Sequence, residues 1–362
     1  MTSAVAIALC RAGFELEAAG DLAALAEQAR AKIACEPLRG EAVVVGRFES
    51  VDPTSWRAAT LARPPIFIRS LWTGTGPHRL AIAGTTRPDR IAPLVDAAVA
   101  LAAASGHEPP WRAPWIEYPD TNDGKALSTL ARALEGRLAA SLRERGLVDD
   151  AARRQAHTLL VDGTTAYVGT ADPDTGSPWP LGFPRLRMPR EAPSRSTLKL
   201  AEAIAVFLGP RDAGRMREGQ SAVDLGAAPG GWTWQLVERG LHVTAVDNGA
   251  LAPSLARHPN VEHVRADALS WRSKRPVDWL VCDVVERPSR IAVLVADWIT
   301  TGRARAAIFN LKLPMKKRRD EALACAALIR DRIAAAGLDA RVALRHLYHD
   351  REEVTGCVLQ RR

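Results

Sequence analysis

The glycine-rich stretch at residues 222–231, AVDLGAAPGG, constrains the fold of this chain more than any other feature. Apolar residues lead up to Asp224, three glycines and a proline then break the run, and WTWQLVERG follows with helical character as far as Gly240. This order of strand, turn and helix is typical of the first crossover of a doubly wound α/β sheet. Because glycine has no Cβ, such a turn lets a ligand reach the backbone, and we expect a ligand here.

An acidic residue at the end of the next strand supports a nucleoside cofactor at this turn. Asp247 follows the predicted strand 242–246 and lies about 20 residues beyond Gly226, an offset at which a carboxylate accepts hydrogen bonds from ribose hydroxyls. The glycine spacing differs from the GxGxxG fingerprint of dinucleotide-binding proteins. It resembles motif I of S-adenosylmethionine-dependent methyltransferases. The simpler alternative is a glycine turn that only packs a helix on a strand.

Length and charge narrow the class of protein. The 362 residues are enough for two or three domains with sizeable cores. The chain has 49 Lys and Arg against 41 Asp and Glu, a net charge of +8. This excess favours an acidic partner such as a nucleic acid, and the alternative is a moderate charge that serves only solubility.

Cysteine usage and hydropathy indicate an intracellular protein. The five cysteines lie far apart, and no CxxC pair or Cys/His cluster offers a metal site. Such a scattered set fits a reducing compartment. No positive charge precedes the first short apolar run, and no run approaches the roughly 18 apolar residues of a membrane span. We therefore expect a cytoplasmic protein that binds no metal and does not associate with a membrane.

The pattern along the chain predicts four regions. Residues 1–54 and 55–170 mix strands and helices as compact α+β domains do. Residues 171–195 hold six prolines and four arginines, which predicts an extended linker that either follows a phosphate backbone or is simply solvated. Residues 196–362 continue the α/β pattern of the glycine turn. The strands expected before the linker are 4–10, 42–48, 66–72, 80–83, 158–161 and 166–169, with a turn at TGTGP (residues 73–77) and helices at 15–31, 91–104 and 125–144.

The last region is the most regular. Ser196 is the expected N-cap of a helix that carries Lys199 in its first turn. Strands are expected to end at Asp247, Arg265, Asp283 and Lys312, with helices at 289–299 and 321–336, the second capped by Asp320 and ended by Gly337, and a hairpin of 341–348 with 355–359.

Four charged residues at strand ends are expected to line one cleft. They are Asp224, Asp247, Asp283 and Lys312, and ligands of open α/β sheets bind beyond the carboxyl ends of the strands. Lys312 beside Asp283 is either a structural ion pair or a general base, if burial and a second cation such as Lys199 lower the pKa of its amine.

A wider set of residues resembles a known family. Lys199, Asp283, Lys312 and Glu353, set around DLGAAPGGWT, resemble the K-D-K-E tetrad of ribose 2′-O-methyltransferases related to FtsJ. CRAGFE (residues 10–15), PREAPSRSTLKL (189–200) and LYHDREEVT (347–355) resemble, more narrowly, the bacterial RlmM family, which methylates the 2′-hydroxyl of one cytidine in 23S ribosomal RNA. The resemblance spans nearly the whole chain. It implies a Rossmann-like S-adenosylmethionine-dependent methyltransferase domain at 196–362, preceded by a ferredoxin-like region at 1–54 and a THUMP RNA-binding domain at 55–170.

The resemblance also implies roles for individual residues. Lys312 is the implied proton acceptor, Asp283 its orienting partner and Lys199 the second cation, while Glu353, or alternatively Glu352, completes the tetrad. The implied contacts to S-adenosyl-L-methionine are Ser196, Gly226, Ala228, Pro229, Gly230, Gly231, Asp247, Asp267 and Asp283. Asp267 would accept a hydrogen bond from the adenine amino group, and an ordinary turn aspartate is its alternative. The implied partner is 23S ribosomal RNA, bound by a monomer.

Two other functions remain as alternatives. A base methyltransferase acting on amino groups would carry an NPPY-like tetrapeptide where this chain has DVVE (residues 283–286), and C5 methylation needs a cysteine nucleophile, whereas Cys282 is expected on the strand face opposite Asp283. A non-catalytic RNA-binding scaffold is the second alternative. The basic run KKRR at 316–319 either holds substrate phosphates or begins a solvated helix, and His107 and His157 are expected to be ordinary surface or packing residues.

Overall fold

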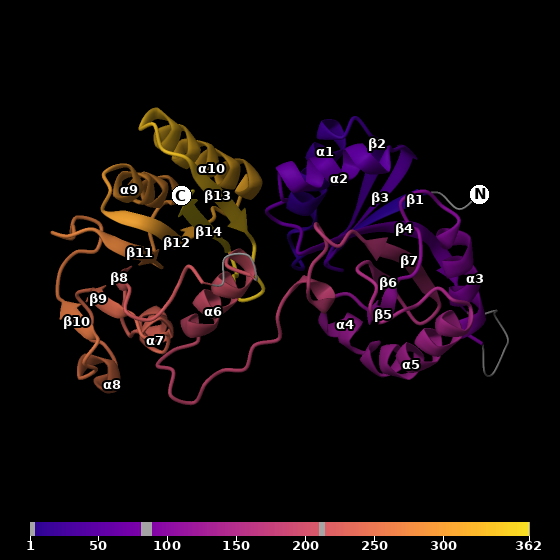
Figure 1. Ribbon diagram of the computed structural model, residues 1–362, viewed down its shortest axis with the longest axis horizontal. Coiled ribbons are helices and arrows are strands. Elements are labelled where there is room, and N and C mark those ends of the chain that lie inside the picture. The colour runs from indigo at the N-terminus through magenta and orange to yellow at the C-terminus, as the bar shows by residue number, and fades with distance from the viewer. Residues whose placement is uncertain (1–3, 81–88, 210–213, 362) are drawn as a thin grey trace. The chain divides into compact units, whose positions relative to one another are not determined.

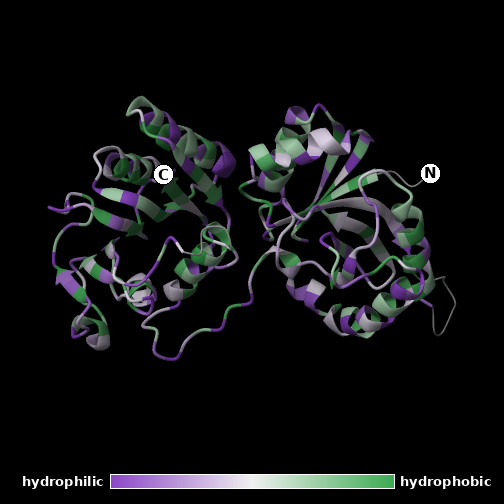
Figure 2. Cartoon of the chain, viewed as in Figure 1, coloured by the Kyte–Doolittle hydropathy of each residue, from purple (hydrophilic) through white to green (hydrophobic). Residues whose placement is uncertain are grey.

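The chain forms two compact units. The computed structural model describes residues 4–80, 89–209 and 214–361, and the chain divides into Met1–Phe183 and Pro184–Arg362 (Figure 1). Each unit is built on one seven-stranded sheet. In Figure 2 most helices carry both hydrophobic and hydrophilic residues, as expected where one face of a helix covers a sheet and the other meets water.

The first unit joins both predicted N-terminal regions in a single sheet of order β2-β3-β1-β4-β7-β6-β5. Its strands are β1 (Ala4–Leu9), β2 (Lys32–Leu38), β3 (Val43–Ser50), β4 (Ser70–Arg79), β5 (Arg112–Glu117), β6 (Gln155–Leu160) and β7 (Thr165–Ala171), and its helices are α1 (Glu15–Gln28), α2 (Pro53–Ala62), α3 (Ile91–Ala102), α4 (Asn122–Lys125) and α5 (Ser128–Glu144). Strand β1 pairs antiparallel with β3 on one side and with β4 on the other. The predicted boundary at residue 54 therefore falls within α2, between strands β3 and β4 of one sheet, and the ferredoxin-like and THUMP assignments stay predictions.

The structure corrects several elements predicted for this unit. The TGTGP segment is no turn: β4 continues through it and pairs with β7 across a register shift between Thr75 and His78. A Cβ on Gly74 would lie 2.0 Å from the carbonyl oxygen of Val168, so glycine here allows two strands to approach closely. Strands β2 and β5 and helix α2 were not predicted; the two strands are edge strands that each contain a proline. Most of the strand expected at 80–83 lies outside the described residues.

The predicted linker carries almost no regular structure, as expected. Its only helical element in the described chain is the short 3₁₀ turn η1 (Pro180–Gly182). The start of the linker is held by the first unit, since the backbone N–H of Leu181 donates to the Glu117 carboxylate at 2.6 Å. The other oxygen of that carboxylate meets His157 Nδ1 at 2.8 Å. His157 is fully buried and is a packing residue, as predicted.

The second unit is a Rossmann-like, doubly wound sheet of order β10-β9-β8-β11-β12-β14-β13. Its strands are β8 (Ser221–Leu225), β9 (His242–Val246), β10 (Val261–Val264), β11 (Val277–Cys282), β12 (Ala304–Lys312), β13 (Ala340–Arg345) and β14 (Glu353–Gln360), and its helices are α6 (Ser196–Phe207), α7 (Gly231–Val237), α8 (Pro253–Ala256), α9 (Pro288–Thr300) and α10 (Arg318–Ala335). Strands β8 to β12 pair in parallel, and β14 adds antiparallel to β12. Figure 1 shows α9 and α10 on one side of this sheet and α6 and α7 on the other.

The strand ends and the terminal hairpin of this unit lie close to their predicted positions. The N-caps of α6 and α10 differ from the prediction. Arg195, not Ser196, is the N-cap of α6, and no side chain caps that helix. The Ser196 hydroxyl instead meets the Ser194 hydroxyl at 2.7 Å. Helix α10 begins two residues before Asp320, after Lys317 in the left-handed region at φ 56°. Asp320 is therefore in the first turn, where a carboxylate favours the helix through its dipole.

Substitution of one glycine in the core of the second unit is expected to lower its stability strongly. Gly356 in β14 faces the fully buried Phe309, and a Cβ on Gly356 would lie 2.3 Å from its ring. We expect Gly356→Ala to lower the free energy of unfolding by about 1–3 kcal/mol, because the enclosed ring has no room to move. Urea unfolding followed by circular dichroism measures the change.

The matched control is Gly136→Ala. Gly136 lies on the exposed face of α5, and a Cβ on this residue would have nothing within 4 Å, so this exchange should raise stability by about 0.5–1 kcal/mol. A Gly356→Ala protein as stable as the wild type would contradict the close packing of β14 on Phe309.

Candidate active site

The glycine loop follows β8 and brings bare backbone to the carboxyl edge of the sheet. Gly226 and Gly230 have φ of 78° and 112°, which favour glycine. A Cβ on Gly230 would lie 2.3 Å from the Leu255 side chain. Ala228 and Pro229 lie between them, and Gly231 begins α7. The strand order turns around β8, whose neighbours are β9 and β11, so the loop lies at the point where ligands of such sheets bind.

Asp247 ties this loop to the end of β9. One carboxylate oxygen accepts the N–H of Ala228 at 3.0 Å, and the other accepts the N–H of Gly249 at 2.7 Å. A carboxylate has about four acceptor positions, so both oxygens retain capacity for ribose hydroxyls. The sequence expectation for Asp247 is thus compatible with its place beside the loop.

Ser196 lies against the same loop from the start of α6. A Cβ on Gly231 would lie 2.2 Å from the Ser196 hydroxyl oxygen. The neighbouring Thr197 hydroxyl donates to the Gly231 carbonyl at 2.9 Å. The helix that carries Lys199 is therefore held directly on the glycine loop.

Asp224 and Asp267 differ from the other predicted residues. Asp224 was expected to line the cleft, yet it is buried, accepts the Thr233 hydroxyl at 2.6 Å and has a pKa that burial raises to about 7. Asp267 is exposed and accepts the Leu269 N–H at 3.2 Å. Hydrogen bonds from Ser270 and Leu269 lower the pKa of Asp267. It makes the contacts of a turn aspartate, and its contact with adenine stays a prediction.

Two lysines and two carboxylates meet beyond the ends of β11 and β12. Lys312 Nζ donates to Asp283 Oδ1 at 2.7 Å and also contacts the Glu353 carboxylate. Lys199 Nζ lies 3.7 Å from Asp283 Oδ2 and contacts the other oxygen of Glu353. The structure thus brings together all four residues of the predicted tetrad.

The position of the fourth member follows from strand register. Glu353 begins β14 directly opposite Lys312 in the antiparallel pair, and its side chain is 8% exposed. The Glu352 side chain is 63% exposed and lies 3.4 Å from Arg318. Geometry therefore favours Glu353 over the alternative, Glu352.

The pKa of the Lys312 amine is raised and not lowered. Burial alone would lower the pKa of its amine, but the carboxylates of Asp283 and Glu353 outweigh burial, and the pKa is raised. The condition set for a general base, that burial and Lys199 lower this pKa, is not met, because the two carboxylates outweigh both. Burial likewise opposes ionisation of Glu353, yet Lys312 and Lys199 hold the pKa of Glu353 below its usual value.

Three polar residues beneath the tetrad were missed by sequence reasoning. The Asn310 amide donates to Asp283 Oδ1 at 2.9 Å, and the Thr355 hydroxyl lies 2.8 Å from Asn310 Oδ1 and 3.0 Å from the Asp350 carboxyl. All three are fully buried. Burial raises the pKa of Asp350 well above its usual value, and the nearby Glu353 adds to this. The two-residue spacing of Asn310 and Lys312 on β12 is the one sequence signal that places them on one strand face.

Glu202 fixes the turn that precedes Glu353, and sequence reasoning missed it as well. Its buried carboxylate accepts the backbone N–H groups of Tyr348 and His349 at 2.8 and 2.9 Å and contacts His349 Nδ1 at 2.7 Å. Glu202 lies one turn after Lys199 on α6. One helix therefore positions both Lys199 and the chain that leads to Glu353.

Three further possibilities, a nucleophilic cysteine, a metal site and a membrane-spanning helix, find no support among the described residues. Cys282 is fully buried, and burial raises the pKa of its thiol to about 12. Among the described residues, no group of three or more His, Cys, Asp and Glu side chains is arranged to hold a metal ion. None of the helices in the described ranges is long and apolar enough to cross a membrane.

Comparison with known proteins identifies relatives of this chain. Residues 192–313 match the model of the FtsJ-like methyltransferase family, and residues 89–172 match the N-terminal model of ribosomal RNA large subunit methyltransferase M. Proteins of that name from Methylococcus capsulatus and Thauera aminoaromatica are each 45% identical to this chain, covering 98% of it and 98% and 95% of their own lengths. Among solved structures, TrmN from Thermus thermophilus aligns over 99% of both chains at 16% identity, with a TM-score of 0.37.

The fold, the glycine loop and the FtsJ match define the second unit as an S-adenosylmethionine-dependent methyltransferase of the FtsJ type. The residues beside the loop are compatible with this cofactor, since both Asp247 oxygens can accept further hydrogen bonds. The chain belongs to the ribosomal RNA large subunit methyltransferase M family.

The buried Asp350 predicts a pH-dependent gain in stability for Asp350→Asn. Because the folded-state pKa of Asp350 is raised, the unfolded chain releases this proton at lower pH than the folded chain does, and wild-type stability falls as pH rises between the two pKa values. Asparagine does not ionise. The melting temperature of Asp350→Asn relative to wild type should therefore increase from about pH 5 to about pH 8. A difference that is constant over this range would contradict the raised pKa.

Proposed function

We propose that this chain transfers a methyl group from S-adenosylmethionine to the ribose 2′-hydroxyl of a cytidine in 23S ribosomal RNA. The observation that carries the proposal is Lys312, held between Asp283 and Glu353 beyond the strand ends. It lies on the sheet whose glycine loop cradles the cofactor. The names of the relatives supply the ribosomal substrate.

Lys312 is the proposed proton acceptor. A ribose hydroxyl is a poor nucleophile until its proton is removed, whereas the sulfonium of the cofactor supplies an already activated methyl group. The neutral Lys312 amine would take the 2′-hydroxyl proton as the oxygen bonds to the methyl carbon, while the bond from that carbon to the sulfonium sulfur breaks and the sulfur leaves as a thioether. The raised pKa of Lys312 keeps the group mainly as ammonium at neutral pH. The proposed step therefore uses the small fraction of Lys312 that is the neutral amine, and transfer should speed up as pH rises.

The remaining tetrad members position Lys312. Asp283 Oδ1 receives both the Lys312 ammonium and the Asn310 amide, so the carboxylate has one defined orientation. Glu353 bridges the two lysines, and Lys199 offsets the negative charge of the carboxylates. We propose that the other predicted contacts, Ser196, Gly226, Ala228–Gly231, Asp247, Asp267 and Asp283, serve the cofactor.

The buried thiol of Cys282 argues against methylation at a base carbon. A nucleophilic cysteine must form a thiolate in contact with its substrate, and this side chain is fully enclosed. The assembled tetrad argues against a scaffold without catalysis, because two partly buried lysines and carboxylates are costly to keep for folding alone. Ribose methylation also fits RNA, which the 2′-hydroxyl distinguishes from DNA.

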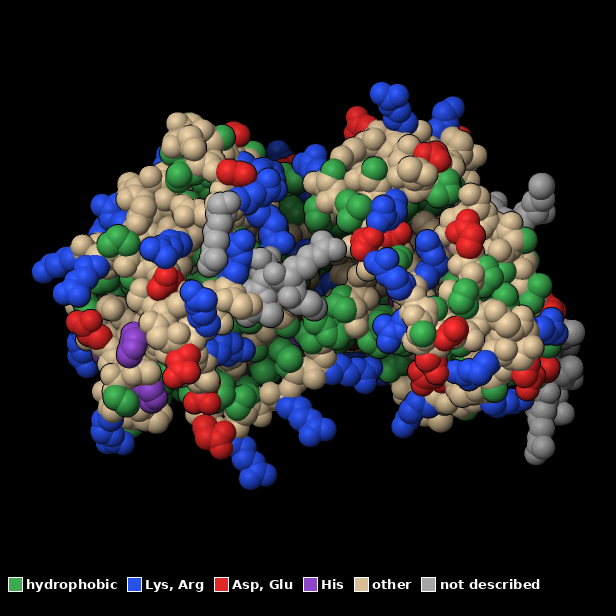
Figure 3. Space-filling view, in the orientation of Figure 1, with side chains coloured by type: hydrophobic (Ala, Val, Ile, Leu, Met, Phe, Trp, Pro, Cys, Tyr) green, Lys and Arg blue, Asp and Glu red, His purple; other side chains and the backbone are tan. Residues whose placement is uncertain are grey.

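An RNA substrate suits the surface charge. Lys and Arg side chains are spread over both units in the view of Figure 3, and the chain carries a net charge of +8. The exposed Lys316 and Lys317 follow Lys312 on the loop before α10. We propose that this run, with Arg318 and Arg319, holds substrate phosphates.

Substitution of Lys312 tests the proposal. Lys312→Arg keeps the positive charge but cannot accept a proton at neutral pH, so methyl transfer should fall by about 100-fold or more for both Lys312→Arg and Lys312→Ala. Affinity for S-adenosylmethionine, measured by calorimetry, should stay within a few-fold of wild type. Retention of turnover in Lys312→Arg would exclude the lysine as base.

A matched pair of glutamates provides the control. Glu353→Gln should slow transfer strongly because it removes one carboxylate from both lysines, whereas Glu352→Gln removes only an exposed partner of Arg318 and should leave the rate nearly unchanged. Equal effects of the two exchanges would contradict the register that places Glu353 in the site.

A further inference from the structure

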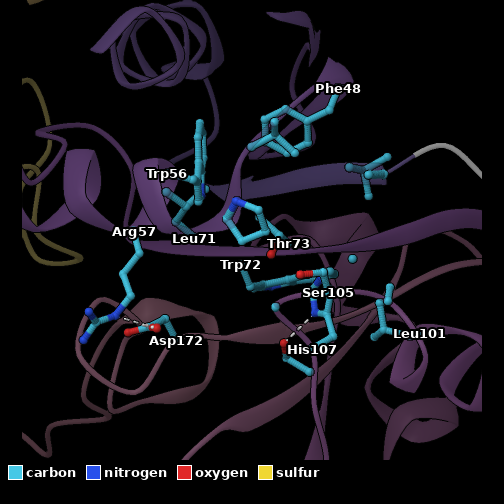
Figure 4. Close-up of a pocket in the computed structure, with 18 of the residues that line it drawn as sticks. Phe48, Trp56, Arg57, Leu71, Trp72, Thr73, Leu101, Ser105, His107 and Asp172 are labelled. Atoms are coloured by element: carbon cyan, nitrogen blue, oxygen red, sulfur yellow. Dashed lines mark hydrogen bonds and ion pairs between the residues drawn. The ribbon is translucent and has the colours of Figure 1, made fainter. Parts of the chain in front are cut away.

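The first unit contains a cavity of about 450 Å³ that the proposed reaction does not use. Its floor is formed by β4 and β7, and its walls by α2 and the residues that follow α3 (Figure 4). The size lies within the range of pockets that hold small molecules or single nucleotides. It is built entirely from residues of the first unit.

One wall is aromatic and fixed. The rings of Phe48 and Trp56 meet edge to face, with centroids 5.0 Å apart. Trp56 is on the first turns of α2, which Asp52 caps by accepting the Ser55 N–H at 2.8 Å. Both rings are almost fully enclosed, so the wall is rigid and apolar. It suits a flat aromatic ligand.

The floor and the opposite wall combine apolar side chains, such as Leu71 and Leu101, with uncharged polar groups. His107 Nδ1 and the Thr170 hydroxyl are 2.7 Å apart, and Thr170 is directly opposite Thr73 in the sheet. Burial lowers the pKa of His107 to about 4, so its ring is neutral at physiological pH. A neutral imidazole and two hydroxyls can both donate and accept hydrogen bonds. The edge of a nucleobase presents the same mixture of donors and acceptors.

Two arginines line the cavity, and one of them is held in ion pairs. Arg57 is held by Asp172 at 2.9 Å and by Asp174. Arg154 also lines the cavity and has no ion pair within the ranges that the structure describes. Because Arg57 is neutralised by its carboxylate partners, Arg154 supplies the remaining positive charge, which fits an uncharged base joined to one phosphate better than a free polyphosphate.

We infer that this cavity binds one unpaired nucleobase of the RNA substrate, packed against Trp56, with the adjoining phosphate at Arg154. The inference rests on the proposed function, because that function makes RNA the substrate. Single-stranded RNA is recognised in this way in general, by bases that leave the stack and contact aromatic side chains. The first unit would then select an unpaired segment rather than a regular duplex.

Two neighbouring alanines give a matched test. Ala104 lines the cavity and Ala103 does not, and both are exposed at the end of α3. Ala104→Trp places a large ring at the cavity wall without truncating a buried side chain, and Ala103→Trp adds the same side chain at a neighbouring position that does not line the cavity. The probes are a short single-stranded oligoribonucleotide and a blunt RNA duplex of equal length, measured by fluorescence anisotropy with the full chain.

For the single strand, the dissociation constant should rise about tenfold in Ala104→Trp, the loss expected from one base contact. It should be unchanged in Ala103→Trp, and neither variant should alter duplex binding. Thr170→Val, which removes one hydroxyl from the floor, should give a smaller loss on the single strand. Wild-type affinity of Ala104→Trp for the single strand, or an equal loss on the duplex, would overturn the inference.

Methyl transfer separates this inference from the proposed function. In Ala104→Trp, KM for RNA should rise while the affinity for S-adenosylmethionine and kcat stay unchanged. If wild type methylates RNA and Ala104→Trp has the same KM, the cavity inference alone is wrong. If wild type binds the single strand in the cavity but methylates no ribose, the proposed function is wrong and the cavity assignment stands.

Discussion

The contact of Lys312 with Asp283 and Glu353 is the interaction on which the second unit depends. Partly buried charges are stable only when each has a partner in good geometry, and this site meets that condition with two lysines and two carboxylates. Parallel pairing of β11 and β12 brings Asp283 and Lys312 to one edge, and antiparallel β14 places Glu353 opposite Lys312. Helix α6 adds Lys199 and, through Glu202, holds the turn before β14. The chemistry therefore follows from strand pairing and from one helix held on the glycine loop.

Much of this site could be predicted because it lies where short sequence patterns are strongest. The glycine turn and the strands that end at Asp247, Asp283 and Lys312 are local signals, and a sheet of this kind brings strand ends together. The choice between Glu352 and Glu353 required the register of β14, since adjacent residues of a strand point to opposite faces. Asn310 and Asp350 were missed because only packing shows that their side chains meet beneath the tetrad. The direction of the Lys312 pKa shift could not be predicted from the sequence, because it depends on the contacts of Lys312 with two carboxylates.

The first unit could be predicted less well, for physical reasons. Glycines and a proline in β4 have the composition of a turn, but they serve a close strand approach and a register shift. Edge strand β5 lacks the alternation that marks a half-buried strand. Edge strand β2 alternates in burial, but Ala34 on its exposed face and the proline within it weaken the signal in the sequence. The cavity beside Trp56 is lined by side chains from segments more than 100 residues apart, from Phe48 to Thr170. No local sequence pattern therefore predicts it. His107, predicted to be an ordinary surface or packing residue, is buried against Thr170 and also lines that cavity.

The central claim is that the tetrad removes a proton from a ribose hydroxyl of ribosomal RNA. The most direct measurement is a map of methylated nucleosides in ribosomal RNA from cells that lack this gene, complemented with wild type or with Lys312→Ala. The account predicts that one 2′-O-methylcytidine in 23S ribosomal RNA is lost with the gene, returns with wild type and stays absent with Lys312→Ala. Loss of a base methyl group instead, or full restoration by Lys312→Ala, would contradict it.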